Sequence, residues 1–453
     1  MLQLFSSGLL SLWLENAGVN AKINPSTLLT WQGVPVFMLP KATEPSVENT
    51  LRQYLQQLAA QGMLTANQGI WIQSGSTLLI NHQGTVPLPA ASLTKTATTL
   101  AALETWGTKH QFETLISATG PINNGVLQGD LVITGVGDPF FVWEEAIALG
   151  NSLNQMGIRQ VTGKLVISGN FYMNYKFDPQ EAGQLLQLAL NSSTWTPLIT
   201  SQYLQMPKGT AKPQVVINGG VEVATLPNPY QVLLLRHRSM TLIQILKQMN
   251  IYSNNEMAEM LARSLGGHQA VMQIAARAAN FPPEEIQLIN GSGLGMENRI
   301  SARAASNMFM TIQRYLQPQN LTLADIFPVS GRDRKGTMET RHIPTGTIVK
   351  TGTLNEVSAL SGVMPTRDRS LVWFTIINRG TDITRLRSQQ DQLLKKLLQQ
   401  WEKPLEIPMA IAPRTDTANA SKYLGDPRRN EIVTQQSAIN LQQNKLVADE
   451  HKN

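Results

Sequence analysis

Three short motifs, far apart in the chain, constrain the fold most, because their side chains can act together only if the fold brings them together. They are Ser92-Leu93-Thr94-Lys95, Ser253-Asn254-Asn255 and Lys350-Thr351-Gly352-Thr353. Each motif is weak evidence when taken alone, since Ser-x-x-Lys is expected about once or twice in a chain of this length. Their order and their surroundings make the combination informative.

The first motif places a hydroxyl and an amine one helical turn apart. The pattern predicts a helix over residues 93–106, so that Ser92 lies at the positive helix end and Lys95 returns to the same face. A serine hydroxyl is a poor nucleophile until a base takes its proton, and a lysine can do so only if burial and a nearby cation lower its pKa. We therefore predict that Ser92 is the nucleophile, Lys95 the general base and Lys350 the nearby cation.

The second motif precedes an amphipathic run that predicts a helix. From this position Ser253 is predicted to relay a proton to the leaving amine. The Asn255 amide is predicted to orient Lys95 and the backbone of a substrate.

The third motif follows residues 345–349, whose β-branched side chains predict a strand. The Thr351 and Thr353 hydroxyls, together with Lys350, are predicted to hold a carboxylate. Gly352 is expected to let a substrate backbone approach closely. The backbone N–H groups of Ser92 and Thr353 are the predicted donors to an oxyanion.

The surroundings of the motifs extend the pattern. The chain also contains Gly135-Val136-Gly137-Asp138-Pro139 and Gly291-Ser292-Gly293-Leu294. With the three motifs, these segments resemble the D-alanyl-D-alanine carboxypeptidase/endopeptidase family, the class C low-molecular-mass penicillin-binding proteins, over residues 46–400. The chain departs from the family pattern at Phe140, where the family usually has Thr, and at Asn290, where it usually has Asp. The stretch between Ser92 and Ser253 is also short for this family.

The resemblance implies an α+β fold. Its catalytic domain is a split β-lactamase/transpeptidase-like domain, an antiparallel sheet flanked by helices, with an inserted β-rich domain. The implied activity is that of a serine D-alanyl-D-alanine carboxypeptidase/endopeptidase, which cleaves peptidoglycan stem peptides through an ester on Ser92. β-Lactams are the implied inhibitors. The sequence leaves open whether a terminal residue or a cross-link is cleaved.

The composition along the chain divides it into five segments. We predict an N-terminal segment over 1–45, a first catalytic part over 46–111, an inserted β-rich part over 112–235, a second catalytic part over 236–404 and a polar, flexible tail over 405–453. Short β-rich runs separated by turn residues identify the insertion. Low apolar periodicity identifies the tail.

The N-terminal segment begins with a broken apolar run over residues 2–14, which is too short to span a bilayer. A signal segment, an interfacial helix and a helix packed on the protein body are the three interpretations, and the second implies peripheral membrane contact. We expect a periplasmic or cell-envelope location, because the inferred substrate lies outside the cytoplasm.

The composition narrows the chemistry further. The chain has no cysteine, which excludes disulfides, thiolate metal ligands and a cysteine nucleophile. Its six histidines are scattered without a metal-binding spacing, so we expect no metal and no cofactor. His237, between Arg236 and Arg238, is expected at the surface. The net charge of +6 is not gathered into a tract, so no nucleic-acid partner is predicted.

Other functions remain open at this point. A β-lactamase or esterase would use the same three motifs, but it also needs a base for the deacylating water. A non-catalytic cell-wall binding protein would not need Ser92, Lys95 and Lys350 together. A Ser-His-Asp mechanism lacks its usual Gly-x-Ser-x-Gly turn.

Overall fold

The computed structural model describes residues 44–225, 230–414 and 423–433, all within one compact unit, Ala42–Asn453. The predicted N-terminal segment therefore lies almost entirely outside the described residues. In the described part of the chain, no helix is long and apolar enough to cross a membrane.

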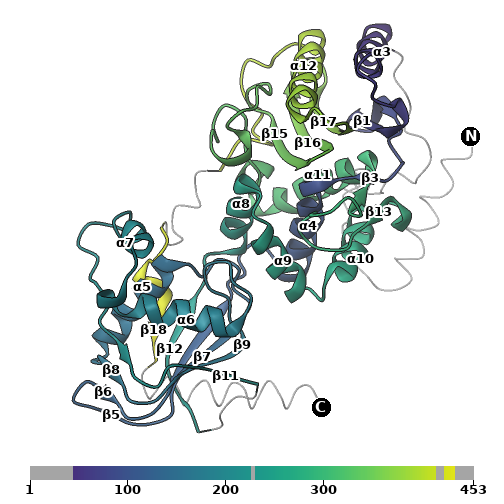
Figure 1. Ribbon diagram of the computed structural model, residues 1–453. Helices are drawn as coiled ribbons and strands as arrows, with labels where there is room; N and C mark the ends of the chain where they lie inside the picture. The colour runs from purple at the N-terminus through teal and green to yellow at the C-terminus, as the bar shows by residue number, and fades with distance from the viewer. Residues whose placement is uncertain (1–43, 226–229, 415–422, 434–453) are drawn as a thin grey trace, which may run out of the picture. The chain divides into compact units, whose positions relative to one another are not determined.

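A five-stranded antiparallel sheet forms the centre of the catalytic part, in the strand order β15-β16-β17-β1-β2. The strands are β1 (Gln68–Ser74), β2 (Thr77–His82), β15 (Ile348–Leu354), β16 (Val357–Thr366) and β17 (Ser370–Arg379). Helices α3 (Pro45–Ala59) and α12 (Ile383–Trp401) cover one face, as Figure 1 shows. Strand β15, which carries the third motif, lies at the edge of this sheet.

Helices cover the other face of the sheet. They are α4 (Thr94–Trp106), α8 (Leu242–Tyr252), α9 (Asn255–Ser264), α10 (His268–Ala279) and α11 (Ala302–Leu316). Every residue of α4 from Thr94 to Leu103 is buried, which fits its small Ala- and Thr-rich side chains and its position among the other helices. A small sheet of β13 (Ile286–Gln287), β14 (Arg299–Ile300) and β3 (Leu88–Pro89) lies beside the start of α4. This arrangement is the predicted α+β fold, an antiparallel sheet flanked by helices.

Between α4 and α8 the chain builds five strands of a second, mixed sheet, and β18 from the C-terminal segment adds the sixth, in the order β11-β9-β7-β4-β12-β18. Its strands are β4 (Glu113–Ala118), β7 (Leu131–Val136), β9 (Leu165–Asn170), β11 (Val221–Ala224), β12 (Val232–Arg238) and β18 (Asn430–Ile432). A four-stranded sheet of β5 (Ile122–Asn123), β6 (Val126–Leu127), β8 (Gln160–Val161) and β10 (Val216–Ile217) accompanies it. Helices α5 (Trp143–Gln155), α6 (Pro179–Leu190) and α7 (Pro197–Tyr203) pack with these strands around a separate hydrophobic core.

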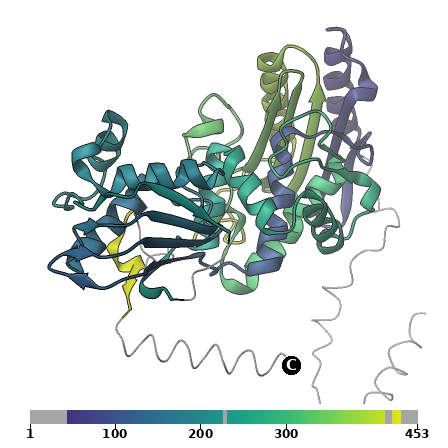
Figure 2. The ribbon, with the colours of Figure 1, turned by 60° about the horizontal axis from the view of Figure 1, so that its bottom comes forward.

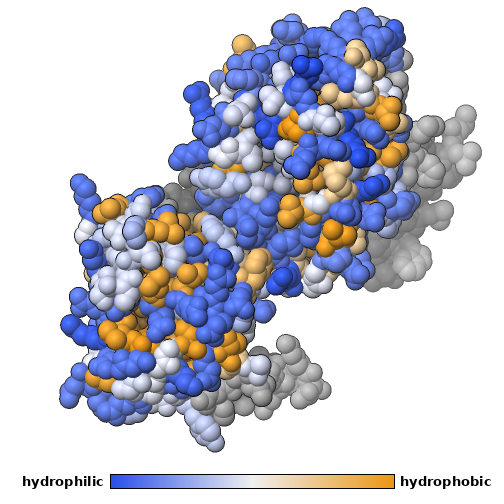
Figure 3. All heavy atoms as spheres, in the orientation of Figure 1, coloured by the Kyte–Doolittle hydropathy of each residue, from blue (hydrophilic) through white to orange (hydrophobic). Residues whose placement is uncertain are grey.

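The surface of this second part carries exposed apolar side chains among polar ones (Figure 3). Leu198 and Leu204, at α7, are 55% and 74% exposed. Single exposed apolar residues are common on globular proteins, so they do not by themselves indicate a partner.

The polar C-terminal segment is partly ordered, contrary to the prediction of a flexible tail over 405–453. Strand β18 pairs with β12 and so extends the second sheet, and Figure 2 shows it in yellow beside the blue strands. Residues 405–414 also contact the body of the protein, since Gln313 donates a hydrogen bond to the Ala410 carbonyl and Ile411 is buried. The tail prediction is wrong for these segments because backbone pairing and buried polar contacts, rather than apolar periodicity, hold them.

His237 is another correction, because it is buried and not at the surface. Its Nδ1 lies 2.7 Å from Asn430 Oδ1, and its ring packs edge-on against Phe141. Burial lowers the pKa of His237. Side chains alternate between the two faces of β12, so an inward histidine lies between two arginines that reach solvent.

A buried ion pair links the C-terminal segment to α5, and its loss should destabilise the protein. Arg429 donates to Glu145, and both side chains are at least 95% buried. Replacing Arg429 with Met leaves the Glu145 carboxylate buried without this partner, so we expect the free energy of unfolding to fall by about 3 kcal/mol. Denaturant unfolding measures this loss. Arg367→Met, at an exposed ion pair, is the control and should cost under about 1 kcal/mol; equal losses in both variants would contradict the account.

Candidate active site

Ser92 lies in a short 3₁₀ turn, Ala91–Leu93, which leads directly into α4. Ala91, just before it, has a φ of +48°, a conformation that a residue with a side chain rarely adopts. Two glycines allow other segments to pack on this turn. A Cβ on Gly293 would lie 1.9 Å from the Ala91 carbonyl oxygen, and one on Gly352 would lie 2.7 Å from the Ala90 carbonyl oxygen. Gly352 thus allows the nucleophile turn to pack closely on β15, and the substrate approach predicted for this glycine stays a prediction.

Lys95 is fully buried and contacts two other parts of the site. Its Nζ lies 3.1 Å from Ser92 Oγ, 2.7 Å from Asn255 Oδ1 and 2.7 Å from the Ser292 carbonyl oxygen. The first and second motifs therefore meet at this amine. Burial lowers the pKa of Lys95 to about 7, so a large fraction of it is neutral at neutral pH.

Glu259 on α9 stabilises this arrangement, and sequence reasoning assigned it no role. Its carboxylate accepts hydrogen bonds from the backbone N–H groups of Gly291, at 3.2 Å, and Ser292, at 2.9 Å. It thereby fixes the segment whose carbonyl accepts from Lys95, and its charge raises the pKa of that lysine against the effect of burial. The available signal was its spacing, four residues after Asn255 on the same helix face.

Lys350 joins the third motif to the second. Its Nζ lies 2.9 Å from Ser253 Oγ and 2.8 Å from the Thr351 carbonyl oxygen, and its side chain is fully buried. Ser253 ends α8 in the left-handed conformation, with φ +52°, which turns the chain toward α9. Burial and, second, the charge of Lys95 hold the pKa of Lys350 well below its usual value. The sequence predicted that burial and the Lys350 cation together lower the pKa of Lys95, and in the structure burial is the first cause for both lysines.

The two threonines of the third motif are placed differently. Thr351 is buried, whereas Thr353 is exposed and its Oγ1 accepts a hydrogen bond from Arg387 of α12 at 2.7 Å. Thr353 pairs with Ser358, whose hydroxyl also contacts α12 through Gln390. The carboxylate-binding role predicted for these hydroxyls stays a prediction.

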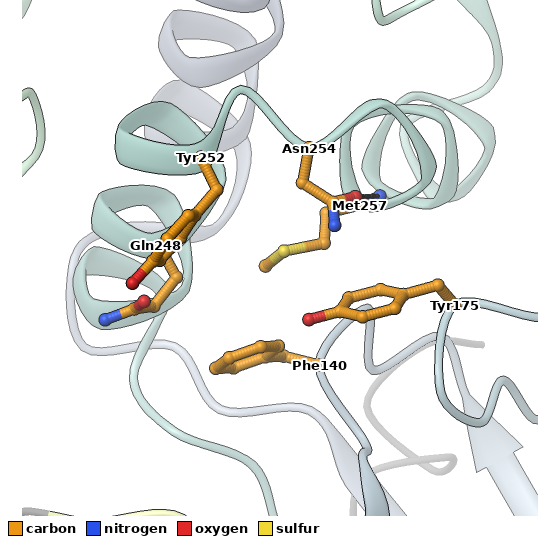
Figure 4. Close-up of a pocket in the computed structure, with 6 residues that line it drawn as sticks. All are labelled: Phe140, Tyr175, Gln248, Tyr252, Asn254 and Met257. Carbon is orange, nitrogen blue, oxygen red and sulfur yellow. Dashed lines mark hydrogen bonds between the residues drawn. The ribbon is translucent and has the colours of Figure 1, made fainter. Parts of the chain in front are cut away.

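A cavity of about 330 Å³ lies beside the second motif. Figure 4 shows the aromatic side chains of Phe140 and Tyr175 facing the side chains of α8 and of the turn after it. The lining residues are Phe140, Tyr175, Gln248, Tyr252, Asn254 and Met257. The cavity is thus lined by residues from both the inserted and the catalytic parts, and none of its six lining side chains is charged.

The geometry gathers the five predicted catalytic residues in two neighbouring hydrogen-bonded groups. Lys95 binds Ser92 and Asn255, and Lys350 binds Ser253, two positions before Asn255. Comparison with known proteins identifies the family: the model of the D-Ala-D-Ala carboxypeptidase 3 (S13) family matches residues 51–179 and 205–400, which is well over half of the chain. The chain belongs to this family. The predicted family, the α+β fold and the class of serine D-alanyl-D-alanine carboxypeptidase/endopeptidase are thereby confirmed.

Relatives of this S13 family member are distant in sequence. It is 24% identical over 432 residues to a D-alanyl-D-alanine carboxypeptidase of Actinomadura sp., a match that covers 72% of this chain and 79% of the relative. It is 27% identical over 165 residues to the carboxypeptidase DacB of Mycolicibacterium smegmatis, covering 32% of this chain and only 35% of the relative. A solved predatory endopeptidase from Bdellovibrio bacteriovorus, in complex with an immunity protein, has the same fold, with a TM-score of 0.64 at 20% identity over 78% of this chain and 99% of that chain.

Among the described residues, no group of three or more His, Asp or Glu side chains is placed to hold a metal ion.

The electrostatics of Lys95 predict a pH dependence. A lysine acts as a base only when neutral, so the acylation rate at Ser92 should rise as the pH increases through about 7. Glu259→Gln removes a negative charge that favours protonated Lys95, so this rise should move to lower pH. Stopped-flow acylation by a chromogenic β-lactam from pH 5 to 9 measures the shift.

Glu256→Gln is the matched comparison, because the Glu256 charge also raises the pKa of Lys95, but less than Glu259 does. We expect a smaller shift in the same direction. A profile that moves to higher pH in Glu259→Gln would contradict the assignment of Lys95 as the base.

Proposed function

We propose that this protein hydrolyses the D-alanyl-D-alanine end of peptidoglycan stem peptides through an ester on Ser92, and that β-lactams acylate the same serine. One observation carries the proposal. Lys95 connects Ser92 to Asn255 while Lys350 holds Ser253, and both lysines are fully buried. These contacts give a nucleophile, a base with a lowered pKa and a second hydroxyl for proton transfer in one site.

In the acylation step, the neutral amine of Lys95 takes the proton of Ser92 Oγ as this oxygen attacks the carbonyl of the penultimate D-alanine. The contact between the two atoms, 3.1 Å, is suitable for this transfer. Ser253 delivers its proton to the leaving nitrogen and takes up the proton that Lys95 gained from Ser92, so that the C–N bond breaks and Lys95 is neutral again. Lys350, 2.9 Å from Ser253 Oγ, orients that hydroxyl and supplies positive charge.

Binding of an anionic substrate favours this protonation pattern. A carboxylate near Lys350 stabilises its charged form, and the charge on Lys350 in turn favours the neutral form of Lys95. The two buried lysines, both with lowered pKa values, therefore have different roles: Lys350 carries the positive charge and Lys95 accepts the proton.

The developing oxyanion is proposed to accept hydrogen bonds from the backbone N–H groups of Ser92 and Thr353. The close packing of β15 on the nucleophile turn supports this pairing, because a Cβ on Gly352 would lie 3.1 Å from the Ser92 nitrogen. Any side chain at position 352 would separate the two donors.

Deacylation uses Lys95 again, now to take a proton from water. Of the side chains in the described ranges, Lys95 is the one within hydrogen-bond distance of Ser92 Oγ. Glu259, the carboxylate next to Lys95, is engaged by two backbone N–H groups rather than aimed at the serine. This arrangement favours a peptidase over a β-lactamase, which needs a separate base for rapid turnover.

The substrate is proposed to be a peptide of the cell envelope. Names of relatives include both carboxypeptidases and a peptidoglycan-cleaving endopeptidase, and both reactions break the same type of bond. The cavity beside Asn254, with its aromatic and neutral polar lining, is suited to a peptide side chain upstream of the scissile bond. A periplasmic or cell-envelope location, and membrane contact by the N-terminal segment, belong to the same proposal.

Removal of the base tests the proposed mechanism. Lys95→Ala should lower the second-order rate of acylation by penicillin by about 10²- to 10⁴-fold, because general-base catalysis contributes this much. Release of D-alanine from a stem pentapeptide should fall in parallel. Lys164→Ala, at an exposed lysine, is the control and should change neither rate.

Two results would redirect the assignment. An unchanged acylation rate in a folded Lys95→Ala protein would remove Lys95 from the mechanism. Rapid turnover of nitrocefin by the wild type, without release of D-alanine from the pentapeptide, would favour the β-lactamase alternative.

A further inference from the structure

Arg387 of α12 belongs to none of the three motifs, yet its side chain contacts the third one. Its Nη2 donates a hydrogen bond to Thr353 Oγ1 at 2.7 Å. Helix α12 packs on the opposite face of the sheet from α4, so this arginine reaches the edge strand β15 from the side away from Ser92.

Among the described residues Arg387 forms no ion pair, although the charge of Asp391 also acts on its guanidinium. The neighbouring carboxylate of Asp391 is bound by Arg341, with contacts of 3.0 and 2.6 Å, and by the His342 backbone N–H at 2.8 Å. In the ranges that the structure describes, no carboxylate lies within ion-pair distance of the Arg387 guanidinium. Burial and the charge of Arg341 lower the pKa of Arg387, yet an arginine stays protonated at neutral pH. A half-buried cation without an ion-pair partner favours an anionic ligand nearby.

The contact also fixes the direction of the Thr353 hydroxyl. A hydroxyl has one proton, and Arg387 donates to its oxygen, so that proton points elsewhere. No acceptor for it is found among the described residues, and Thr353 is exposed on the edge strand beside the nucleophile turn. The hydroxyl is therefore oriented to donate to a ligand that lies along β15.

We propose that Arg387 is a positioning residue for the free carboxylate of the substrate's leaving residue, acting through the Thr353 hydroxyl and through its own charge. The inference rests on the proposed function, because it assigns the ligand as the carboxylate of the residue that Ser92 displaces. The favoured substrate class is acyl-D-alanyl compounds whose leaving group carries a carboxylate. β-Lactams with a carboxylate beside the ring belong to the same class.

Two thiolesters that differ only in that carboxylate provide the test. One joins N-benzoyl-D-alanine to thioglycolate, and the other is the methyl ester of the first. Ser92 displaces thioglycolate from one and methyl thioglycolate from the other, and a thiol reagent detects both thiols. We expect Arg387→Met to lower kcat/KM for the carboxylate thiolester by about tenfold, mainly by raising KM. The same variant should change kcat/KM for the methyl ester by less than about twofold. Arg387→Lys should recover part of the loss, because it keeps the charge.

Arg385→Met is the matched control. Arg385 lies on the same helix, is exposed and pairs with Asp382, so its replacement should leave both substrates unchanged. If Arg387 had only a structural role, its replacement would lower kcat/KM equally for both substrates, and that result would overturn the inference. An unchanged kcat/KM for both substrates in Arg387→Met would overturn the inference as well.

Two further outcomes are separated by the design. If Arg387→Met does not fold, Thr353→Val is used in its place: a loss confined to the carboxylate thiolester supports the inference, and an equal loss or none overturns it. If the wild type hydrolyses neither thiolester, the proposed function fails. If the wild type hydrolyses both at equal rates through Ser92, the proposed function stands and the inference about Arg387 fails.

Discussion

The burial of two lysine side chains in one site is the constraint on which the rest of the structure depends. Moving a charged ammonium group out of water costs roughly several kcal/mol for each ion. The cost falls if the protein supplies hydrogen-bond acceptors or if the amine loses its proton. The protein does both. Lys95 and Lys350 are surrounded by hydroxyl, amide and carbonyl oxygens, and burial lowers the pKa of each. A base that is available near neutral pH follows directly from this burial.

The fold serves this constraint at several places. Helix α4 is buried along most of its length, which keeps water from Lys95. The left-handed conformations at Ala91 and Ser253 place two hydroxyl-bearing turns against the lysines. Strain of this kind is expected at functional sites, where the surrounding packing determines the backbone. Gly293 and the strand edge at Gly352 then close the turn around Ser92.

Short-range patterns were sufficient to predict the motif residues, because a helical turn and a strand have fixed geometry, and the family resemblance that those motifs carry implied the α+β fold. Interactions between residues far apart in the sequence could not be predicted in this way. Glu259 acts through backbone N–H groups more than thirty positions away, and Arg387 reaches the third motif from a helix that follows it in the chain. The tail prediction failed for the same reason, since the order of residues 423–433 depends on a buried partner, Glu145, far away in sequence. His237 was placed wrongly because its flanking arginines outweighed the alternation of its strand.

The central claim is that buried Lys95 activates Ser92 for attack, and the site of covalent attachment tests it most directly. The purified protein is incubated with penicillin, digested and analysed by mass spectrometry, with Ser92→Ala as the comparison. The account predicts one penicilloyl adduct on the peptide that contains Ser92, and none in the variant. An adduct on another serine, or an adduct that persists in Ser92→Ala, would contradict it.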